Sequence, residues 1–279
     1  MSPARDLRRP PPIGSSGVPF GRAHRYRRAP RSRTRPRPSG HFIPTSSALP
    51  QFPIPSGVVD RRRLRAIARR LAKAYGTPPP PRHLPPLEEL VLTVLSQHTS
   101  DTNRDRAYAD LRRRFADWDE VADAPLPALA RAIRRGGLGP TKAVRIRAML
   151  RGIRESSVPL DEHAFTDTPD QRLWDTLVAL PGVGPKTAAC VLLFSLDRPF
   201  FPVDTHVHRV AIRLGLVPPR ADAVATQAAF QESVPDEEMY ALHMNLIRHG
   251  REVCTAQRPR CSACVLRDLC PRVGVTSSR

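Results

Sequence analysis

Apolar residues recur at helical spacing along most of the chain from Val58 onward. Leu64, Ile67 and Leu71 lie at positions i, i+3 and i+7 of an otherwise basic segment, which predicts a surface helix with one buried stripe. Residues 87–95 (LEELVLTVL) are apolar on almost every side, so we expect a central buried helix there. Further amphipathic segments follow near residues 103–115, 126–135, 141–154, 169–180, 185–197, 205–215, 222–231 and 235–249.

Glycine and proline separate many of these segments, as at Gly136-Gly137 and Pro218-Pro219, and such residues mark turns. The proline-rich stretch 78–86 is typical of a stiff connector between helices. No run of residues alternates with period two, and no internal repeat of fixed length is present. The pattern therefore predicts an all-α fold.

Residues 1–57 lack apolar periodicity and carry 12 of the 32 prolines, so we expect them to be disordered. Three interpretations of this tail remain open. It is a flexible cationic arm that adds phosphate contacts, an extension produced by an upstream start codon, or a targeting segment for an organelle. Its proline density opposes the amphipathic helix that a transit peptide requires.

The net charge of +19 indicates a polyanionic partner. Residues 1–40 contribute +10 of it, from 11 arginines against Asp6. No apolar run approaches the roughly 18 residues of a membrane span, and five cysteines do not suit a secreted disulfide scaffold. The whole chain has only three lysines, at positions 73, 142 and 186, so each lysine raises the question of why arginine does not stand there.

Four of the five cysteines fall within 17 residues, with gaps of six, two and five: Cys254, Cys261, Cys264 and Cys270. Thiolates this close in a reducing compartment predict a metal site. The single Cys-x-x-Cys pair favours a [4Fe–4S] cluster over structural zinc, which usually takes two such pairs far apart. Zinc stays the alternative on spacing alone. Cys190 lies in an apolar segment and is expected to be plain core.

Residues 180–188 (LPGVGPKTA) lie between two apolar helical segments. Gly182 and Gly184 can adopt positive φ, and Pro185 fits the first position of the next helix. The turn of Gly182, Val183 and Gly184 would then present free amides and a helix N-terminus to an anion such as a DNA phosphate. An ordinary helix–helix turn is the simpler alternative.

Lys186 follows this turn, in a chain that otherwise uses arginine. Unlike arginine, a lysine amine can lose its proton and act as a nucleophile. We expect the helix dipole and partial burial to lower the pKa of Lys186. A lysine that only contacts phosphate is the alternative. Asp204 stands eighteen residues later, where a helix N-cap belongs. His206 and His208 do not share a helix face, so a structural role is favoured for both.

Together, the hairpin 180–188, the segment 203–210 (VDTHVHRV) and the four-cysteine terminus resemble the endonuclease III family of helix-hairpin-helix DNA glycosylases. The resemblance covers roughly residues 58–279. It implies a six-helix barrel lobe at 83–198 and a cluster lobe formed by 58–82 and 199–279. The [4Fe–4S] loop would be at 254–270.

The resemblance also implies roles for single residues. Lys186 would attack the sugar of a flipped nucleotide, and Asp204 would stabilise the developing positive charge and assist proton transfer. His98, in the segment 95–101 (LSQHTSD), stands where the family has a gap-filling glutamine. Leu138, in 137–142 (GLGPTK), resembles the residue that wedges into the duplex. A helix-end histidine and a packing leucine are the alternatives.

The resemblance therefore implies a bifunctional DNA glycosylase and abasic-site lyase that acts on oxidised or ring-saturated pyrimidines in double-stranded DNA. Lys186 is the basis of this assignment, because the adenine-specific and thymine-mismatch relatives lack a lysine at this position. We expect a monomer in the bacterial cytoplasm. The alternatives are a monofunctional glycosylase for another lesion and a DNA-binding redox sensor without catalytic chemistry.

Overall fold

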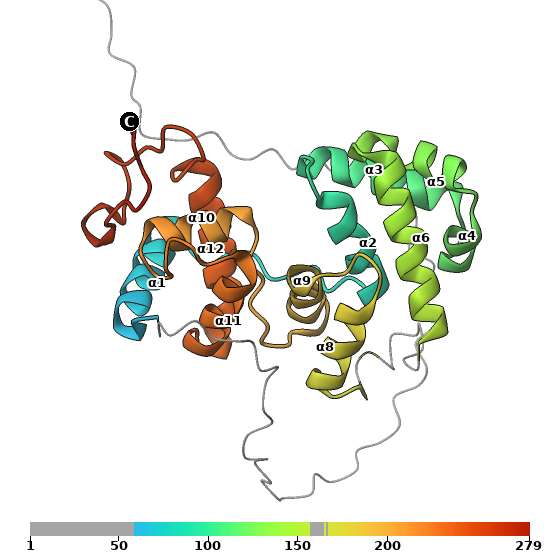
Figure 1. The fold of residues 1–279 in the computed structure, drawn as a ribbon, viewed down its shortest axis with the longest axis horizontal. Helices are drawn as coiled ribbons and strands as arrows, with labels where there is room; N and C mark the ends of the chain where they lie inside the picture. The colour runs from blue at the N-terminus through green and yellow to red at the C-terminus, as the bar shows by residue number, and fades with distance from the viewer. Residues whose placement is uncertain (1–58, 157–164, 166) are drawn as a thin grey trace, which may run out of the picture. The chain divides into compact units, whose positions relative to one another are not determined.

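The computed structural model describes residues 59–156, 165 and 167–279. The expected tail of residues 1–57 lies outside them. The described residues all belong to one compact unit, shown in Figure 1. Its α-helices are α1 (Arg61–Tyr75), α2 (Pro86–Ser96), α3 (Asp101–Arg114), α4 (Trp118–Asp123), α5 (Leu126–Ala132), α6 (Gly139–Glu155), α8 (Asp170–Ala179), α9 (Pro185–Leu196), α10 (Thr205–Arg213), α11 (Ala223–Ser233) and α12 (Met239–Glu252). The described residues also include three short 3-10 helices: η1 (Arg134–Gly136), η2 (Asp236–Glu238) and η3 (Arg267–Leu269).

The all-α prediction is confirmed, since the described part of the chain contains helices and no strand. Each amphipathic segment that the sequence predicted corresponds to a helix, with ends that differ by a few residues. Helix α4 was missed, because its six residues are too few to show a periodic pattern. None of the described helices is long and apolar enough to cross a membrane.

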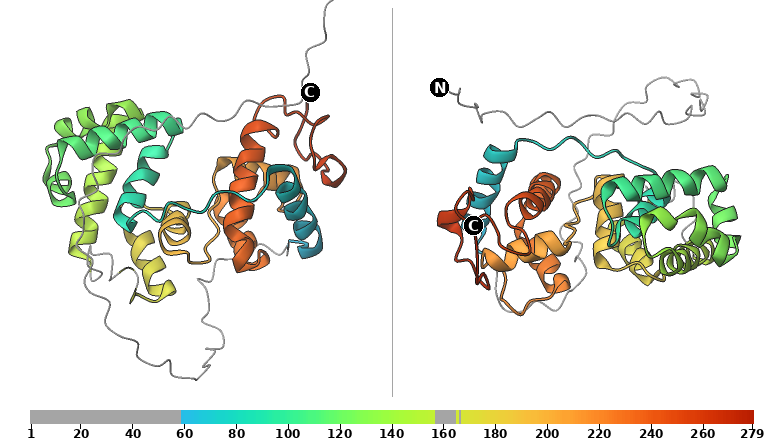
Figure 2. Two further views of the ribbon diagram at one scale, coloured as in Figure 1. Left: turned by 180° about the vertical axis from the view of Figure 1, so that it is seen from behind. Right: turned by 90° about the horizontal axis from the view of Figure 1, so that it is seen from above.

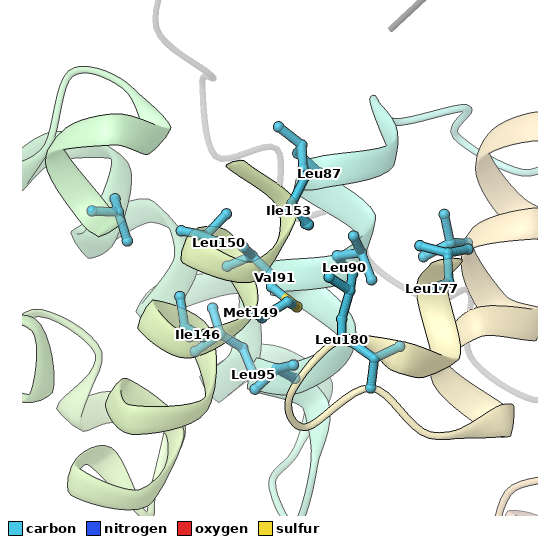
Figure 3. Packing of buried hydrophobic residues seen from close by; sticks show 14 of the residues in the cluster. Leu87, Leu90, Val91, Leu95, Ile146, Met149, Leu150, Ile153, Leu177 and Leu180 are labelled. Carbon is cyan, nitrogen blue, oxygen red and sulfur yellow. The ribbon is translucent and has the colours of Figure 1, made fainter. Parts of the chain in front are cut away.

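Helix α2 is the centre of the first of two hydrophobic cores, as its sequence predicted. Its residues Leu90, Val91 and Leu95 are completely buried. They pack between Met149 and its neighbours on α6 and Leu177 on α8, as Figure 3 shows. Helix α9 also packs along α2. Burial on several sides explains why α2 is apolar almost all round.

The second core brings together helices that are distant in sequence. The buried stripe of α1, formed by Leu64, Ile67 and Leu71, packs with residues of α10, α11 and α12. The loop that carries the four clustered cysteines follows α12 and packs against the same core (Figure 2). The boundaries at residues 82/83 and 198/199 stay predictions, because all these helices belong to one compact unit.

Candidate functional site

The hairpin between α8 and α9 is a tight turn with a free outer face. Gly182 has φ +82, and the N–H of Val183 donates to the carbonyl of Leu180 at 3.1 Å. Gly184 instead has φ −98, so the expectation of positive φ holds for Gly182 alone. A Cβ at Gly184 would have no atom within 4 Å. Its missing side chain therefore leaves open space at the start of α9.

Val183 is buried, with only 5% of its surface exposed. Its side chain anchors the hairpin in the first core and leaves the backbone to face outward. Within the described residues, the N–H groups of Gly182 and Gly184 have no recorded acceptor. The N-terminus of α9 therefore leaves N–H groups available to an anion, and the use of this turn as a DNA phosphate site stays a prediction.

Lys186 lies in the first turn of α9 and is half-buried. Its amine interacts with groups from three helices. These groups are the thiol of Cys190 one turn further along α9, the carboxylate of Asp204 before α10, and the carboxylate of Glu89 on α2. A partly buried lysine whose charge is influenced by two carboxylates is a candidate for functional chemistry.

The pKa of Lys186 is shifted in the direction opposite to the one expected. Burial disfavours the charged amine, but attraction to Cys190, Asp204 and Glu89 outweighs burial and raises the pKa of Lys186. The predicted lowering is therefore wrong, because it left out these neighbours: Cys190 lies one turn along the same helix, and packing brings Asp204 and Glu89 near the amine. The amine is protonated at rest and has to lose its proton before it can act as a nucleophile.

Asp204 is the N-cap of α10, as predicted. Its Oδ1 accepts hydrogen bonds from the N–H of His206 at 2.9 Å and from the N–H of Val207 at 2.8 Å. Both bonds use the same oxygen, so Oδ2 takes no part in the cap. One side chain can thus fix the helix end and hold a negative charge near Lys186.

The ring of His208 forms a hydrogen bond with the carbonyl of Ala221 at 2.8 Å, which is a structural role.

His98 and Leu138 are both exposed residues in left-handed backbone conformation. Each has φ 51 without being glycine, a conformation that costs about 1–3 kcal/mol. Leu138 is 55% exposed, the largest exposed fraction among the large apolar residues of the described chain. Leu138 therefore belongs to neither hydrophobic core of the described residues, and its role as a wedge stays a prediction.

The four clustered cysteines line one cavity after α12. Cys254, Cys261, Cys264 and Cys270 are all partly buried and none forms a disulfide. The same cavity is lined by four arginines: Arg213, Arg260, Arg267 and Arg272. No group of three or more possible ligands in the described residues is arranged to hold a single metal ion.

Two family models match the chain. Residues 91–236 match the HhH-GPD superfamily of base excision DNA repair proteins, and residues 254–270 match the iron–sulfur binding domain of endonuclease III. The chain belongs to the HhH-GPD superfamily. The prediction of an endonuclease III-like protein is confirmed, and so is its iron–sulfur cofactor, a [4Fe–4S] cluster.

Relatives of known sequence and structure agree with this membership in a DNA glycosylase family. Endonuclease III of Thermotoga maritima is 33% identical over 207 residues, which are 74% of this chain and 92% of that protein. A DNA glycosylase homologue of Arabidopsis thaliana is 37% identical over 193 residues, 67% of this chain and 65% of the plant protein. A non-covalent endonuclease III–DNA complex superposes with a TM-score of 0.66 at 29% identity and covers 76% of this chain and 95% of that one.

The cysteine cavity fits the cluster in its donor set and in its charge. A cubane takes four thiolates and carries net negative charge, which suits the wall of arginines around the cavity. Burial raises the pKa of the thiols of Cys264 and Cys270. Iron binding would be required to hold these thiols in the thiolate form.

Two side chains reach the cysteine sulfurs from outside the loop. His249 on α12 places Nε2 at 3.5 Å from the Sγ of Cys264, and its Nδ1 lies 2.8 Å from the hydroxyl of Tyr75 on α1. Burial lowers the pKa of His249 to about 4, so the ring is neutral. Because a cluster-bound thiolate only accepts, Nε2 has to carry the proton and Tyr75 has to donate to Nδ1. Arg213 donates to the Sγ of Cys254 at 3.4 Å.

Sequence reasoning missed Glu89, Cys190 and Lys142. Glu89 is one of two adjacent glutamates, with Glu88, at the start of a mostly apolar helix, and that contrast could have marked the pair. Cys190 stands four residues after Lys186, hence on the same face of a helix, which spacing alone could have shown. Lys142 gives no such signal, because its partners are defined only by the folded chain.

Proposed function

We infer that this protein is a DNA glycosylase with abasic-site lyase activity, in which Lys186 forms a covalent intermediate with the deoxyribose. The observation that carries this proposal is the amine of Lys186 at the start of α9, directly after the hairpin and under the electrostatic influence of Asp204. An endonuclease III–DNA covalent intermediate, 29% identical and with a TM-score of 0.65, supports the same chemistry here.

The reaction begins with proton loss from Lys186, since its raised pKa keeps the amine charged at rest. Asp204 is the acceptor with a free carboxylate oxygen, because the N-cap bonds use only Oδ1. The free amine then attacks C1′ and the base departs with the electrons of the glycosidic bond. Opening of the sugar gives an imine, and loss of a C2′ proton expels the 3′ phosphate.

In this proposal, DNA binding depends on backbone N–H groups of the hairpin and on the loops of Leu138 and His98 more than on the net positive charge of the protein. Gly182 and Gly184 offer their N–H groups to a phosphate at the start of α9. The strained, exposed Leu138 would enter the duplex as a wedge, and His98 would bond the base left without its partner. Flipping of the damaged nucleotide is required, because C1′ cannot be attacked within the stack.

Borohydride trapping tests the covalent step. Reduction during incubation with a duplex that contains an abasic site or thymine glycol should attach the protein to DNA. Lys186→Gln should abolish the adduct and leave binding to the same duplex largely intact. Lys73→Gln is the matched control, because Lys73 is exposed near the end of α1 and should have no effect. An unchanged adduct in Lys186→Gln would refute the assignment.

A panel of defined lesions tests the substrate class. Oxidised or ring-saturated pyrimidines should be excised with strand cleavage at the same rate as base release. Base release without strand cleavage, on any lesion or mismatch, would instead identify a monofunctional glycosylase. Binding without release on every substrate would identify a DNA-binding protein that uses the cluster for another purpose.

A further inference from the structure

Lys142, in the first turn of α6, is a lysine without access to solvent. Only 1% of its surface is exposed, and it is the largest of the fully buried side chains in the described residues. Its Nζ donates to the carbonyl of Leu95 at 2.7 Å and to the carbonyl of Gly136 at 2.7 Å. Burial lowers the pKa of Lys142, so the fold bears a cost to keep an amine here.

The two carbonyls that Lys142 binds stand at the ends of two helices. Leu95 lies in the last turn of α2, and Gly136 is the last residue of η1. Carbonyls at a helix C-terminus lack partners within the helix and carry the negative end of its dipole. One ammonium group therefore satisfies both helix ends and fixes the distance between them.

The end of α2 leads into the loop that contains His98, and the end of η1 leads into the loop that contains Leu138; both residues have a positive φ. His98 follows Leu95 by three residues, and Leu138 follows Gly136 by two. The neighbouring Gly139 allows no side chain, because a Cβ there would stand 2.9 Å from the carbonyl of Ala130. The backbone on both sides of Leu138 is thus held in place, with Lys142 as the link to the loop of His98.

Arg145, one turn further along α6, extends the same arrangement. Its Nη1 donates to the Oε1 of Gln97 at 2.7 Å, in the loop that contains His98. The stem of Arg145 also lies against the hairpin, since a Cβ at Gly182 would stand 3.3 Å from the Cγ of Arg145. The start of α6 is therefore in contact with all three segments that the proposed function assigns to DNA.

We propose that Lys142 is a positioning residue that sets the relative placement of the Leu138 and His98 loops before DNA binds. The inference rests on the proposed function, which gives these loops their role in opening the duplex. Lys142 itself cannot reach a phosphate, because it is buried. Arginine would not serve, since a planar guanidinium is too large for a site in which a compact ammonium meets two carbonyls at 2.7 Å.

A double-mutant cycle tests this inference. The substrate is a duplex with a tetrahydrofuran abasic-site analogue beside 2-aminopurine, whose fluorescence rises when the base is unstacked. Leu138→Ala should weaken binding about tenfold, the loss that truncation of an anchoring side chain commonly causes. Lys142→Met should weaken binding and reduce the fluorescence rise to a similar extent. The double variant should be no weaker than the more severe single variant, because both changes remove the same function.

The matched control is Ile153→Ala, a buried residue near the other end of α6. It should lower the melting temperature as Lys142→Met does, but leave binding and fluorescence unchanged. If Lys142→Met does not fold, Lys142→Gln keeps an amide NH2 group that can donate to the carbonyls and should show the same coupling with a smaller effect.

Additive losses in the cycle, or a binding loss in Ile153→Ala equal to that in Lys142→Met, would overturn the positioning role. If Leu138→Ala alone leaves binding unchanged, the wedge assignment fails and the inference fails with it. Borohydride trapping of the parent protein is measured separately, so its outcome decides the proposed chemistry of Lys186 whatever the cycle shows.

Discussion

Replacement of Asp204 by asparagine separates the two roles of this side chain. In the parent protein, Oδ1 of Asp204 accepts hydrogen bonds from the N–H of His206 at 2.9 Å and from the N–H of Val207 at 2.8 Å. The amide oxygen of asparagine can accept the same two bonds. The negative charge near Lys186 is lost. Asp204→Asn should therefore keep the cap and remove the group that takes the proton from Lys186.

The expected magnitudes differ between stability and activity. Asparagine and aspartate cap a helix about equally well. Asp204→Asn should therefore lose only the favourable interaction of the negative charge with the helix dipole, about 0.3–1 kcal/mol of unfolding free energy. Asp204→Ala also removes the cap and should lose about 0.5–2 kcal/mol more. Both variants should lower the rate of base release about 100-fold or more, the usual contribution of a general acid or base.

Single-turnover base release and urea unfolding at pH 7 measure the two quantities on the same samples. Asp222→Asn is the matched control, because Asp222 caps α11 through the N–H of Ala225 at 2.7 Å and has no part in the proposed chemistry. It should lose a similar small amount of stability and no activity.

Two results would refute this reasoning. If Asp204→Asn loses as much stability as Asp204→Ala, the carboxylate charge is needed for folding and its catalytic role is not separable. If Asp204→Asn releases base at the rate of the parent protein, the charge takes no part in the reaction.

Three further predictions follow from buried groups. Burial lowers the pKa of His243 to about 4, so the unfolded chain binds a proton that the folded one does not. Stability should fall by about 3 kcal/mol as pH decreases from 6.5 to about 4, and urea unfolding should show a shallower decrease in His243→Phe. Gly250→Ala places a Cβ 2.9 Å from the Cβ of His206, so calorimetry should show a loss of about 1–3 kcal/mol; an unchanged melting temperature would contradict this contact. His249→Leu removes a hydrogen bond to the Sγ of Cys264, so voltammetry should give a more negative reduction potential, and a shift in the opposite direction would contradict the assigned donor.

The sequence determined the features that depend on neighbours along the chain. The apolar period predicted the long helices, and the buried stripe of α1 and the burial of α2 are as expected. The cysteine spacing indicated an iron–sulfur loop, and Asp204 was correctly placed as an N-cap. These features are local, because a helix period, a cap or a ligand loop involves only a few consecutive residues.

Only the tertiary structure decided what surrounds the lysines. Burial lowers the pKa of Lys186, and the net rise comes from Cys190 on the same helix together with Asp204 and Glu89, two carboxylates that only packing brings near the amine. Lys142 binds a carbonyl 47 residues away in the chain, and no local pattern indicates that contact. Charge interactions and buried hydrogen bonds depend on distance in space, so their partners are defined only once the helices have packed.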